Sequence, residues 1–220
     1  MNENATPPID IAGLRQEYRL HALDEQDVAT DPITQFNQWF AEAVKAKVEE
    51  PNAMSLATVK ANGSPACRIV LLKGVEAGGF VFYTNYDSHK GQQVAANNQA
   101  ALTFFWQGLE RQVRIEGTIA KVPAEVSDTY FQSRPRSSRI GAWVSAQSNV
   151  IENRQVLEAT QQALEARYEG QEVPRPAHWG GYSLKPVRIE FWQGRASRLH
   201  DRLGYALTAE GTWHIKRLAP

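Results

Sequence analysis

The chain has 220 residues, and its 24 lysines and arginines balance its 24 aspartates and glutamates. Zero net charge argues against a large, sequence-blind electrostatic surface for nucleic acid or an anionic membrane, although it allows a local basic pocket. Because 42% of the residues are hydrophobic and 22% are charged, the composition is that of a folded globular protein rather than a disordered one.

Several sequence features bear on location and on metals. The longest apolar runs span four residues, as in 69–72, whereas a membrane-spanning helix needs about 20. The polar N-terminus lacks the apolar core of a signal peptide, so we expect a cytoplasmic protein. The single cysteine, Cys67, excludes an intramolecular disulfide, and the five histidines lack metal-ligand spacing, so we expect no metal site.

The N-terminal part of the sequence predicts a tail followed by helices. Residues 1–9 resemble a disordered tail, and residues 10–20 are expected to form a short helix. Asp31 and Pro32 supply an N-cap and a proline at the first helical position. Apolar residues then recur at helical spacing, which predicts an amphipathic helix of about 18 residues that ends near residues 49–51.

The rest of the chain is dominated by strand patterns. Asn62-Gly63 is a strong hairpin signal between the first two strands. We predict strands at 53–60, 65–72, 80–84, 100–106, 111–122, 182–193, 203–207 and 212–217, and helices at 88–97, 123–133 and 152–169. No linker, repeat, βαβ alternation or G-x-G-x-x-G motif occurs. We therefore predict one α+β domain over residues 10–220, an antiparallel, mainly β barrel with peripheral helices.

The first candidate site segment is 68–73, where Arg68 and Lys73 bracket an apolar run. On a continuous strand these two positions face opposite sides of the sheet. One cation would then serve a ligand while the other serves a neighbouring site. The alternative is a buried strand with solvated charged ends.

The second candidate segment is 130–139, which holds Tyr130, three arginines and several serines near a helix boundary. Planar guanidinium groups, hydroxyls and helix N-termini all suit a phosphate. The alternative is a solvated basic loop. The apolar continuation over 140–144 favours the phosphate site, because it would anchor the segment to a core.

The third candidate segment is 190–202, in which Arg198 and His200 alternate with Leu199. In an extended chain both side chains would face one side, as a cation beside a proton-labile imidazole. A lone histidine is more often structural. Similarly, His89 and Lys90 after Ser88 indicate either an anion site at a helix N-terminus or merely a capped surface helix.

Taken in order, these motifs resemble the pyridoxamine 5′-phosphate oxidase family. The resemblance covers most of the chain from about residue 15 and is carried by E-F-W-Q-x-x-x-x-R-L-H-D-R (190–202), RIVLLK (68–73), FYTN (82–85), LERQV (109–113), SRPRSSRIGAWVSAQ (133–147), HWGG (178–181) and the C-terminal RLAP. It implies an FMN-binding split barrel that works as a homodimer, with two sites at the subunit interface.

The resemblance also implies site residues. It implies FMN contacts from Arg68, Ile69, Val70, Leu71, Leu72, Lys73, Tyr83, Thr84, His89, Lys90, Gln112, Gln147, Ser148, Trp192 and Arg202. It implies substrate contacts from Arg15, Tyr18, Lys73, Tyr130, Arg134, Ser138, Arg198 and His200, with Arg198 and His200 flanking the pyridine ring as catalytic residues and the 15–18 segment as a lid. The family usually has arginine where this chain has His89, which suggests a weaker grip on the FMN phosphate.

The implied activity is that of pyridoxal 5′-phosphate synthase (EC 1.4.3.5) in vitamin B6 metabolism. Pyridoxamine 5′-phosphate or pyridoxine 5′-phosphate would be oxidised by hydride transfer to the flavin, with O2 as the final acceptor and H2O2 as product, and ammonia would leave from the amine. The alternatives are another split-barrel flavoprotein, such as a flavin reductase or an oxygenase, and a non-catalytic carrier of flavin or pyridoxal phosphate.

Overall fold

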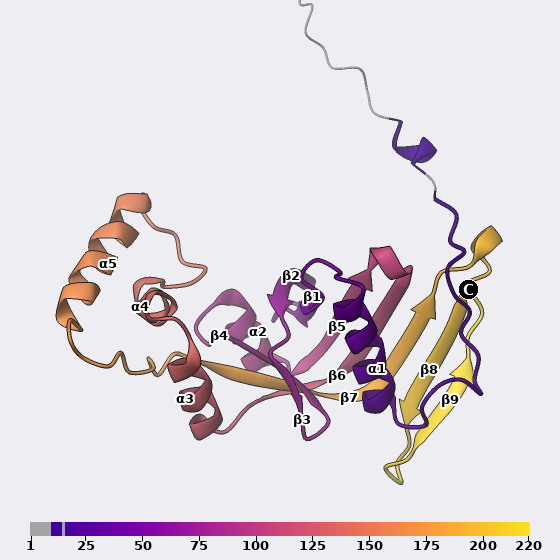
Figure 1. Ribbon diagram of the computed structural model, residues 1–220. Coiled ribbons are helices and arrows are strands. Elements are labelled where there is room, and N and C mark those ends of the chain that lie inside the picture. The colour runs from indigo at the N-terminus through magenta and orange to yellow at the C-terminus, as the bar shows by residue number, and fades with distance from the viewer. Residues whose placement is uncertain (1–9, 15) are drawn as a thin grey trace, which may run out of the picture.

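The computed structural model describes residues 10–14 and 16–220, so the predicted tail at 1–9 lies outside the described residues. The described strands form one curled antiparallel sheet in the order β2-β1-β5-β6-β7-β4-β3, with β8 and β9 added beside β7 (Figure 1). The strands are β1 (Ala53–Val59), β2 (Pro65–Leu71), β3 (Gly74–Glu76), β4 (Gly79–Asn85), β5 (Gln99–Trp106), β6 (Arg111–Lys121), β7 (Trp179–Gln193), β8 (Asp201–Leu207) and β9 (Trp213–Arg217). This sheet with peripheral helices confirms the predicted fold class.

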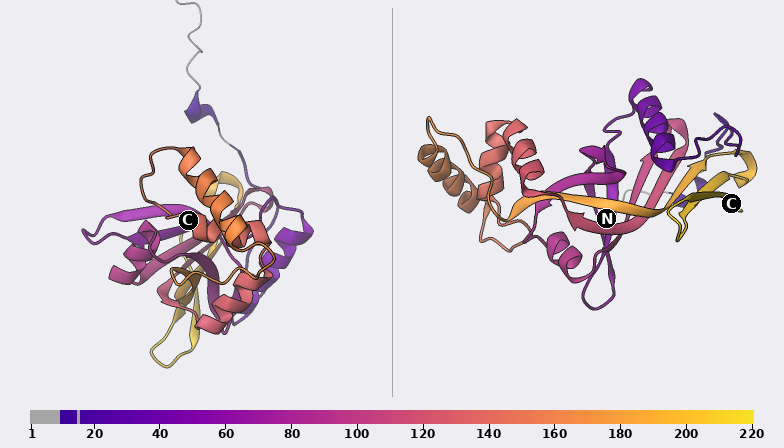
Figure 2. Two further views of the ribbon diagram at one scale, coloured as in Figure 1. Left: turned by 90° about the vertical axis from the view of Figure 1, so that its left-hand side faces the viewer. Right: turned by 90° about the horizontal axis from the view of Figure 1, so that it is seen from below.

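The helices lie around the sheet rather than within it (Figure 2). They are α1 (Pro32–Lys45), α2 (His89–Ala96), α3 (Ala124–Ser133), α4 (Arg136–Val144) and α5 (Arg154–Arg167), with 3₁₀ turns η1 (Ile11–Gly13), η2 (Gln107–Leu109) and η3 (Ala196–Arg198). Helices α3 to α5 gather at one end of the molecule, and β8 and β9 lie at the other (Figure 1).

Strand β7 spans the distance between these two ends. Its first residues pair with β4 from Asn85↔Trp179 onward, its last residues pair with β8, and β6 runs beside both parts. The register shifts between Glu116 and Gly117, opposite Pro186, which has no N–H to offer the ladder. A Cβ atom on Gly117 would lie 2.0 Å from the carbonyl oxygen of Lys185. Only glycine therefore allows β6 and β7 to approach this closely.

Helix α1 covers the main core of the sheet. The Asp31 side chain caps it by accepting a hydrogen bond of 2.8 Å from the backbone N–H of Thr34, as predicted. Phe36 and Trp39 are buried against the sheet, and their rings make edge contacts with Phe80 and Phe191. The helix ends at Lys45, earlier than predicted, because the chain turns through a positive φ at residue 47.

A second, smaller core lies where helices α3, α4 and α5 meet the start of β7. It contains Phe131, Ile140, Tyr168, Val173 and Trp179. Helix α4 was not expected, because its sequence was interpreted as a basic segment with an apolar anchor. Ile140 belongs to that apolar anchor, and it is the residue of α4 that is buried.

The predicted helix over 10–20 is wrong, since the described residues 10–14 and 16–20 contain only the 3₁₀ turn η1. The reason is a competing set of hydrogen-bond partners. The backbone N–H groups of Arg19 and Leu20 donate to the side chain of Glu110, and that of Leu23 donates to Asp201. Residues 16–25 therefore lie as an irregular segment along the sheet.

Candidate active site

A cavity of about 700 Å³ lies between β2, β4, the N-terminus of α2 and helices α3 and α4. We call it the basic cavity. Twelve predicted site residues line it: Arg68, Ile69, Val70, Leu71, Lys73, Tyr83, Thr84, Lys90, Tyr130, Arg134, Ser138 and Gln147. The structure thus brings together residues that are up to 79 positions apart in the sequence, from 68 to 147.

The charge of this cavity is one-sided. Arg68, Lys73, Lys90 and Arg134 line it, and none of its lining residues is acidic. Partial burial lowers the pKa of Arg68, Lys90 and Arg134, and the neighbouring Arg68 lowers that of Lys90 further. Cations that are partly desolvated and lack a counter-ion favour binding of an anion.

Arg68 is held rigidly at one side of the basic cavity. Its guanidinium donates to the carbonyl oxygen of Leu56 at 3.1 Å, to Thr58 Oγ1 at 2.6 Å and to Gln93 Oε1 at 2.9 Å. These hydrogen bonds to strand β1 and helix α2 fix the orientation of the Arg68 guanidinium. The expectation that Arg68 and Lys73 face opposite sides is wrong, because β2 ends at Leu71 and Lys73 lies beyond the strand alternation.

The N-terminus of α2 lies next to Arg68 and carries Lys90. Lys90 Nζ donates to Gln147 Oε1 at 3.0 Å, and the same oxygen accepts from Thr84 Oγ1 at 3.1 Å. Ser88 caps the helix, as its position before His89 predicted. The positive end of a helix dipole together with a cation is suited to a phosphate.

Arg134, between α3 and α4, also lines the basic cavity and lies against an aromatic stack. Tyr83 and Tyr130 are stacked with centroids 3.8 Å apart, and Trp179 is nearly parallel to both. The Arg134 guanidinium carbon lies 4.5 Å from the centroid of the Trp179 ring. Its Nη1 atom is buried and has no hydrogen-bond partner among the described residues. A buried charged donor without an acceptor is costly, so this atom fits an anionic ligand group.

Tyr83 adds a donor to the same wall. Burial, with smaller contributions from Glu76 and Tyr130, raises its pKa to about 12. Its phenol therefore stays protonated at neutral pH and keeps an O–H to offer a ligand.

A second pocket, of about 510 Å³, lies at the other end of the sheet. We call it the Tyr18 pocket. It is lined by Leu14, Gln16, Glu17, Tyr18, Arg195, Ser197, Arg198 and His200. It joins three of the predicted substrate residues, Tyr18, Arg198 and His200. Arg15, predicted beside them, lies outside the described residues.

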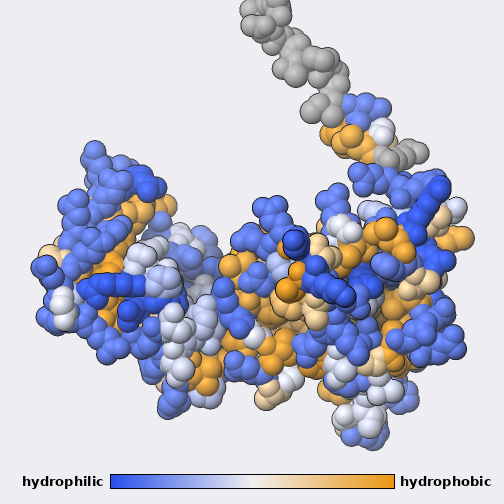
Figure 3. Space-filling view, in the orientation of Figure 1, coloured by the Kyte–Doolittle hydropathy of each residue, from blue (hydrophilic) through white to orange (hydrophobic). Residues whose placement is uncertain are grey.

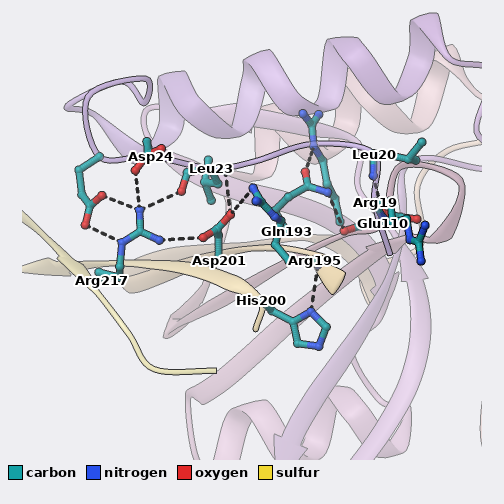
Figure 4. A network of polar contacts seen from close by, with 12 residues as sticks. Arg19, Leu20, Leu23, Asp24, Glu110, Gln193, Arg195, His200, Asp201 and Arg217 are labelled. Carbon is teal, nitrogen blue, oxygen red and sulfur yellow. Dashed lines mark hydrogen bonds and ion pairs between the residues drawn. The ribbon is translucent and has the colours of Figure 1, made fainter. Parts of the chain in front are cut away.

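His200 is oriented by its own loop (Figure 4). The backbone N–H of Arg195 donates to His200 Nδ1 at 3.1 Å, so the neutral ring carries its proton on Nε2. Burial and the positive charge of Arg198 lower the pKa of His200, and Asp201 partly opposes them. The imidazole is therefore biased toward the neutral form at neutral pH.

The predicted extended geometry of this segment is wrong, although both side chains do line one pocket. Arg198 lies in the 3₁₀ turn η3 with a φ of 61°, and β8 begins only at Asp201. The turn, rather than strand alternation, brings Arg198 and His200 to the same side.

Trp192 lies beside the Tyr18 pocket, with ring centroids 5.6 Å from Tyr18 and 4.7 Å from His200. Its cross-strand partners are Gln112 on β6 and Arg202 on β8, so three predicted FMN residues lie side by side. Arg202 donates to both carboxylate oxygens of the buried Glu190, at 2.9 and 3.0 Å. This role of Glu190 was not predicted from the sequence, in which its only signal is its place in the 190–202 motif.

The remaining predicted residues lie at the edges of the site. Leu72 is buried in the main core. The backbone N–H of His89 donates to Ser148 Oγ at 3.2 Å, and both residues are exposed outside the lining of the basic cavity. Trp179 was not assigned a role from the sequence, although it belongs to the HWGG motif and lines the basic cavity.

The basic cavity and the Tyr18 pocket are far apart within one chain. Trp179 and Trp192 mark them at the two ends of β7, and their separation of 13 residues corresponds to roughly 40 Å along a strand. The predicted site residues therefore form two groups at opposite ends of the molecule. A single copy of the chain does not unite them.

Two further findings concern membranes and metals. No helix among residues 10–14 and 16–220 is long and apolar enough to cross a membrane. Within the same residues, no three or more histidine, cysteine or acidic side chains are grouped so as to hold a metal ion.

The curled sheet and its flanking helices define the class of split-barrel proteins. A solved structure of PhzG from Burkholderia lata in complex with tetrahydrophenazine-1-carboxylic acid aligns with a TM-score of 0.85 and 29% identity, over 91% of this chain and 99% of that one. An FMN-binding protein from Nostoc punctiforme related to pyridoxamine 5′-phosphate oxidase shares the fold, with a TM-score of 0.68 and 17% identity over 84% of this chain and 97% of that one.

The family follows from the sequence comparison. Residues 40–168 match the family pattern of pyridoxamine 5′-phosphate oxidase, and residues 179–220 match the C-terminal dimerisation region of pyridoxine 5′-phosphate oxidase. The chain is similar to the pyridoxine/pyridoxamine 5′-phosphate oxidases of Burkholderia lata (59% identity) and Cupriavidus pinatubonensis (57%), over 96% of this chain and 99% of each relative. It belongs to the pyridoxamine 5′-phosphate oxidase family.

Proposed function

We propose that this protein oxidises pyridoxamine 5′-phosphate or pyridoxine 5′-phosphate to pyridoxal 5′-phosphate, with FMN as cofactor and O2 as electron acceptor. The products would include H2O2, and ammonia from the amine, and the reaction would serve vitamin B6 synthesis and salvage in the cytoplasm. Family membership supports an oxidase. The single observation that carries the substrate is the basic cavity, with four cations, no acidic lining residue and an unpartnered buried nitrogen on Arg134.

The cations of the basic cavity come from two sets of elements, β2 with α2 and the α3–α4 connection, which suits two phosphates. Arg68 and Lys90, with the N-terminus of α2, form one cationic group. Arg134, with Tyr130 and Ser138, forms the other, and Lys73 lines the same cavity. We assign the first group to the phosphate of FMN and the second to the 5′-phosphate of the substrate, because guanidinium groups and hydroxyls bind a terminal phosphate with directional bonds.

Bound FMN would supply the two-electron acceptor that O2 then reoxidises. The residues of the chain would bind and orient. Arg134 would hold the substrate phosphate, and the stack of Tyr83, Tyr130 and Trp179 would keep the guanidinium in place. His200, neutral and with its proton on Nε2, would offer a hydrogen bond beside the pyridine ring. Much of the rate enhancement would then come from positioning.

A homodimer would complete the site. The dimerisation region at 179–220 contains β8, β9 and half of the residues that line the Tyr18 pocket, among them Arg198 and His200. Large hydrophobic side chains are exposed on the strands and their connections, including Ile69, Phe105, Val187 and Leu199, and orange hydrophobic residues reach the surface across the sheet in Figure 3. A partner subunit would cover such surface. We propose that the Tyr18 pocket of one protomer meets the basic cavity of its partner.

The cofactor is tested by purification and release of the chromophore. We expect a yellow protein with about one FMN per chain, because the FMN residues implied by the resemblance occur once in each chain. Finding FAD after denaturation, or no flavin after reconstitution, contradicts the cofactor assignment.

The reaction is tested by a steady-state peroxide assay with each phosphorylated substrate. Turnover of pyridoxine 5′-phosphate supports the proposal. Oxidation of NAD(P)H without turnover of the phosphorylated substrates would identify a flavin reductase. Binding of flavin or of pyridoxal phosphate without any turnover would identify a carrier. Tetrahydrophenazine-1-carboxylic acid, the ligand of the PhzG structure, is the matched alternative substrate. It carries no phosphate for Arg134, so we expect it to be turned over poorly.

A further inference from the structure

The guanidinium of Arg217, at the end of β9, is surrounded by acceptors (Figure 4). Nε and Nη2 bind the two carboxylate oxygens of Glu25 at 2.9 and 2.6 Å, and Nη1 binds Asp201 Oδ1 at 2.9 Å. Nη2 also lies 3.0 Å from Asp24 Oδ1 and from the carbonyl oxygen of Leu23. We call Arg217, Asp24, Glu25 and Asp201 the Arg217 clasp.

Asp201 extends the clasp to the loop that carries the site. Its second oxygen, Oδ2, accepts from the backbone N–H of Leu23 at 3.1 Å and from Arg195 Nη1 at 3.2 Å. The backbone N–H of Arg195 in turn orients His200 through Nδ1. One carboxylate therefore ties the N-terminal segment to the loop of His200.

A second anchor holds the same segment a few residues earlier. Glu110 Oε2 accepts from the backbone N–H groups of Arg19 at 2.8 Å and Leu20 at 3.0 Å. Tyr18, the next residue toward the N-terminus, packs so closely on Gly194 that a Cβ there would lie 2.7 Å from the Tyr18 side chain. From this position the Tyr18 ring contacts Trp192 and His200.

Residues 16–25 form no helix or strand of their own, so their position depends on these anchors and on the burial of Leu23 in the main core. An exposed ion pair alone contributes little to stability. A bidentate guanidinium pair within a network that also bonds backbone groups is more specific, because it defines where the segment lies.

We propose that Arg217 is a positioning residue: the Arg217 clasp, together with Glu110, holds residues 16–25 against the sheet and so places Tyr18 over the His200 side of the Tyr18 pocket. Arg217 itself does not line that pocket. The effect on catalysis rests on the proposed function, in which the Tyr18 pocket contacts the substrate. The effect on the segment does not.

The first test is limited trypsinolysis of the flavin-loaded protein, with cleavage after Arg19 followed by mass spectrometry. Arg217→Met keeps the aliphatic stem and removes the charge, and we expect cleavage to become about tenfold faster, since cleavage follows local opening. Arg217→Lys is expected to restore part of the protection. Arg154→Met removes an exposed ion pair on α5 and is the matched control. Equal cleavage rates in wild type and Arg217→Met overturn the proposal.

The second test is steady-state kinetics of the same variants with pyridoxine 5′-phosphate. We expect KM to rise roughly tenfold in Arg217→Met, with kcat changed less than about threefold and FMN content unchanged, because positioning of a binding wall is lost. A lower melting temperature with unchanged KM and cleavage would show a purely structural role and overturn the proposal. Glu25→Gln removes the bidentate partner from the other side and serves if Arg217→Met does not fold.

The two tests separate the two proposals. If neither the wild type nor any variant oxidises the phosphorylated substrates, the proposed function is wrong. Cleavage after Arg19 still decides whether the clasp holds the segment, because that measurement needs no substrate.

Discussion

Arg134 combines features that a structural arginine in a folded chain seldom shows. Its guanidinium is stacked on Trp179, yet Nη1 is buried without an acceptor among the described residues. The neighbouring Arg136, in contrast, has acceptors for its guanidinium, because its Nη1 and Nη2 donate to the carbonyl oxygens of Gln171 and Tyr168. Two arginines two positions apart thus take different roles, and the difference lies in which acceptors the fold supplies.

Replacing Arg134 tests the phosphate assignment directly. Arg134→Ala is expected to lower kcat/KM for pyridoxine 5′-phosphate by roughly 30- to 150-fold, equivalent to about 2–3 kcal/mol for a lost charge-assisted contact. Unphosphorylated pyridoxine cannot use the contact, so its poor rate should barely change. Arg134→Lys should recover only part of the loss, because a point charge lacks the fork. Equal losses for both substrates would reject the assignment.

His200 yields a prediction about pH. Its folded pKa lies below the ordinary value of 6.5 because of burial and Arg198, so the unfolded chain binds the proton more readily. The folded state is therefore favoured by the neutral His200 ring. This contribution to the free energy of unfolding is fully present above pH 6.5 and is lost as the pH falls through the folded pKa. Titration of the ring C–H signal, assigned by comparison with His200→Asn, should have its midpoint below 6.5. A midpoint above 6.5 would mean that Asp201 outweighs Arg198 and burial.

At the scale of elements, β7 connects the two halves of the candidate site. Trp179, its first residue, lies beside the basic cavity, and Trp192, near its end, lies beside the Tyr18 pocket. The pairing with β6 is continuous except at the irregularity between Glu116 and Gly117. This irregularity lies between the two ends of β7. Its geometry therefore affects how the two ends of the strand are oriented relative to each other.

Gly117→Ala should therefore be strongly destabilising. The new methyl would lie 2.0 Å from the carbonyl oxygen of Lys185, which is backbone of the adjacent strand and cannot rotate away. We expect a loss of about 2 kcal/mol or more in unfolding free energy, measured by urea denaturation of the flavin-loaded protein. Gly108→Ala is the matched control, because a Cβ there has open space. Similar midpoints for the two variants would contradict this account.

At the scale of the whole molecule, the two groups of predicted site residues lie apart within one chain, and we propose that a second copy brings them together. The basic cavity holds the four cations that we assign to phosphates, and the Tyr18 pocket holds Arg198 and His200. They lie at opposite ends of one sheet (Figure 1). A dimer related by a two-fold axis would form both composite sites at once, each from one basic cavity and one Tyr18 pocket.

Subunit complementation tests this arrangement. Arg134→Ala and Arg198→Ala should each be nearly inactive alone. After co-refolding of equal amounts, about half of the dimers are mixed, and each mixed dimer has one intact composite site, so about one quarter of wild-type activity should return. Each homodimer refolded alone is the control. No recovery, with mixed dimers demonstrated by mass spectrometry, would show that each site is built within one chain.

Local signals in the sequence were sufficient for most of the elements. Asp31-Pro32 defined the start of α1, Asn62-Gly63 defined the first hairpin, and strand patterns located most of β1 to β9, because capping, turn chemistry and period-2 alternation act over a few residues. Exceptions were short or context-dependent. The three-residue β3 was missed, and α4 was not expected because its start follows Pro135 within a basic segment.

The sequence by itself also determined the family, and with it the residues that we propose for the chemistry, because the ordered motifs resemble one family along nearly the whole chain. Only the tertiary structure decided how they are arranged. Arg68 and Lys73 share a cavity because the strand ends between them, and Arg198 and His200 share a pocket because of a turn with positive φ. The segment 16–25 is irregular because its backbone N–H groups bind Glu110 and Asp201, 90 or more positions away. Contacts between residues so distant in sequence leave no local pattern, since their partners are brought together only by the folded sheet.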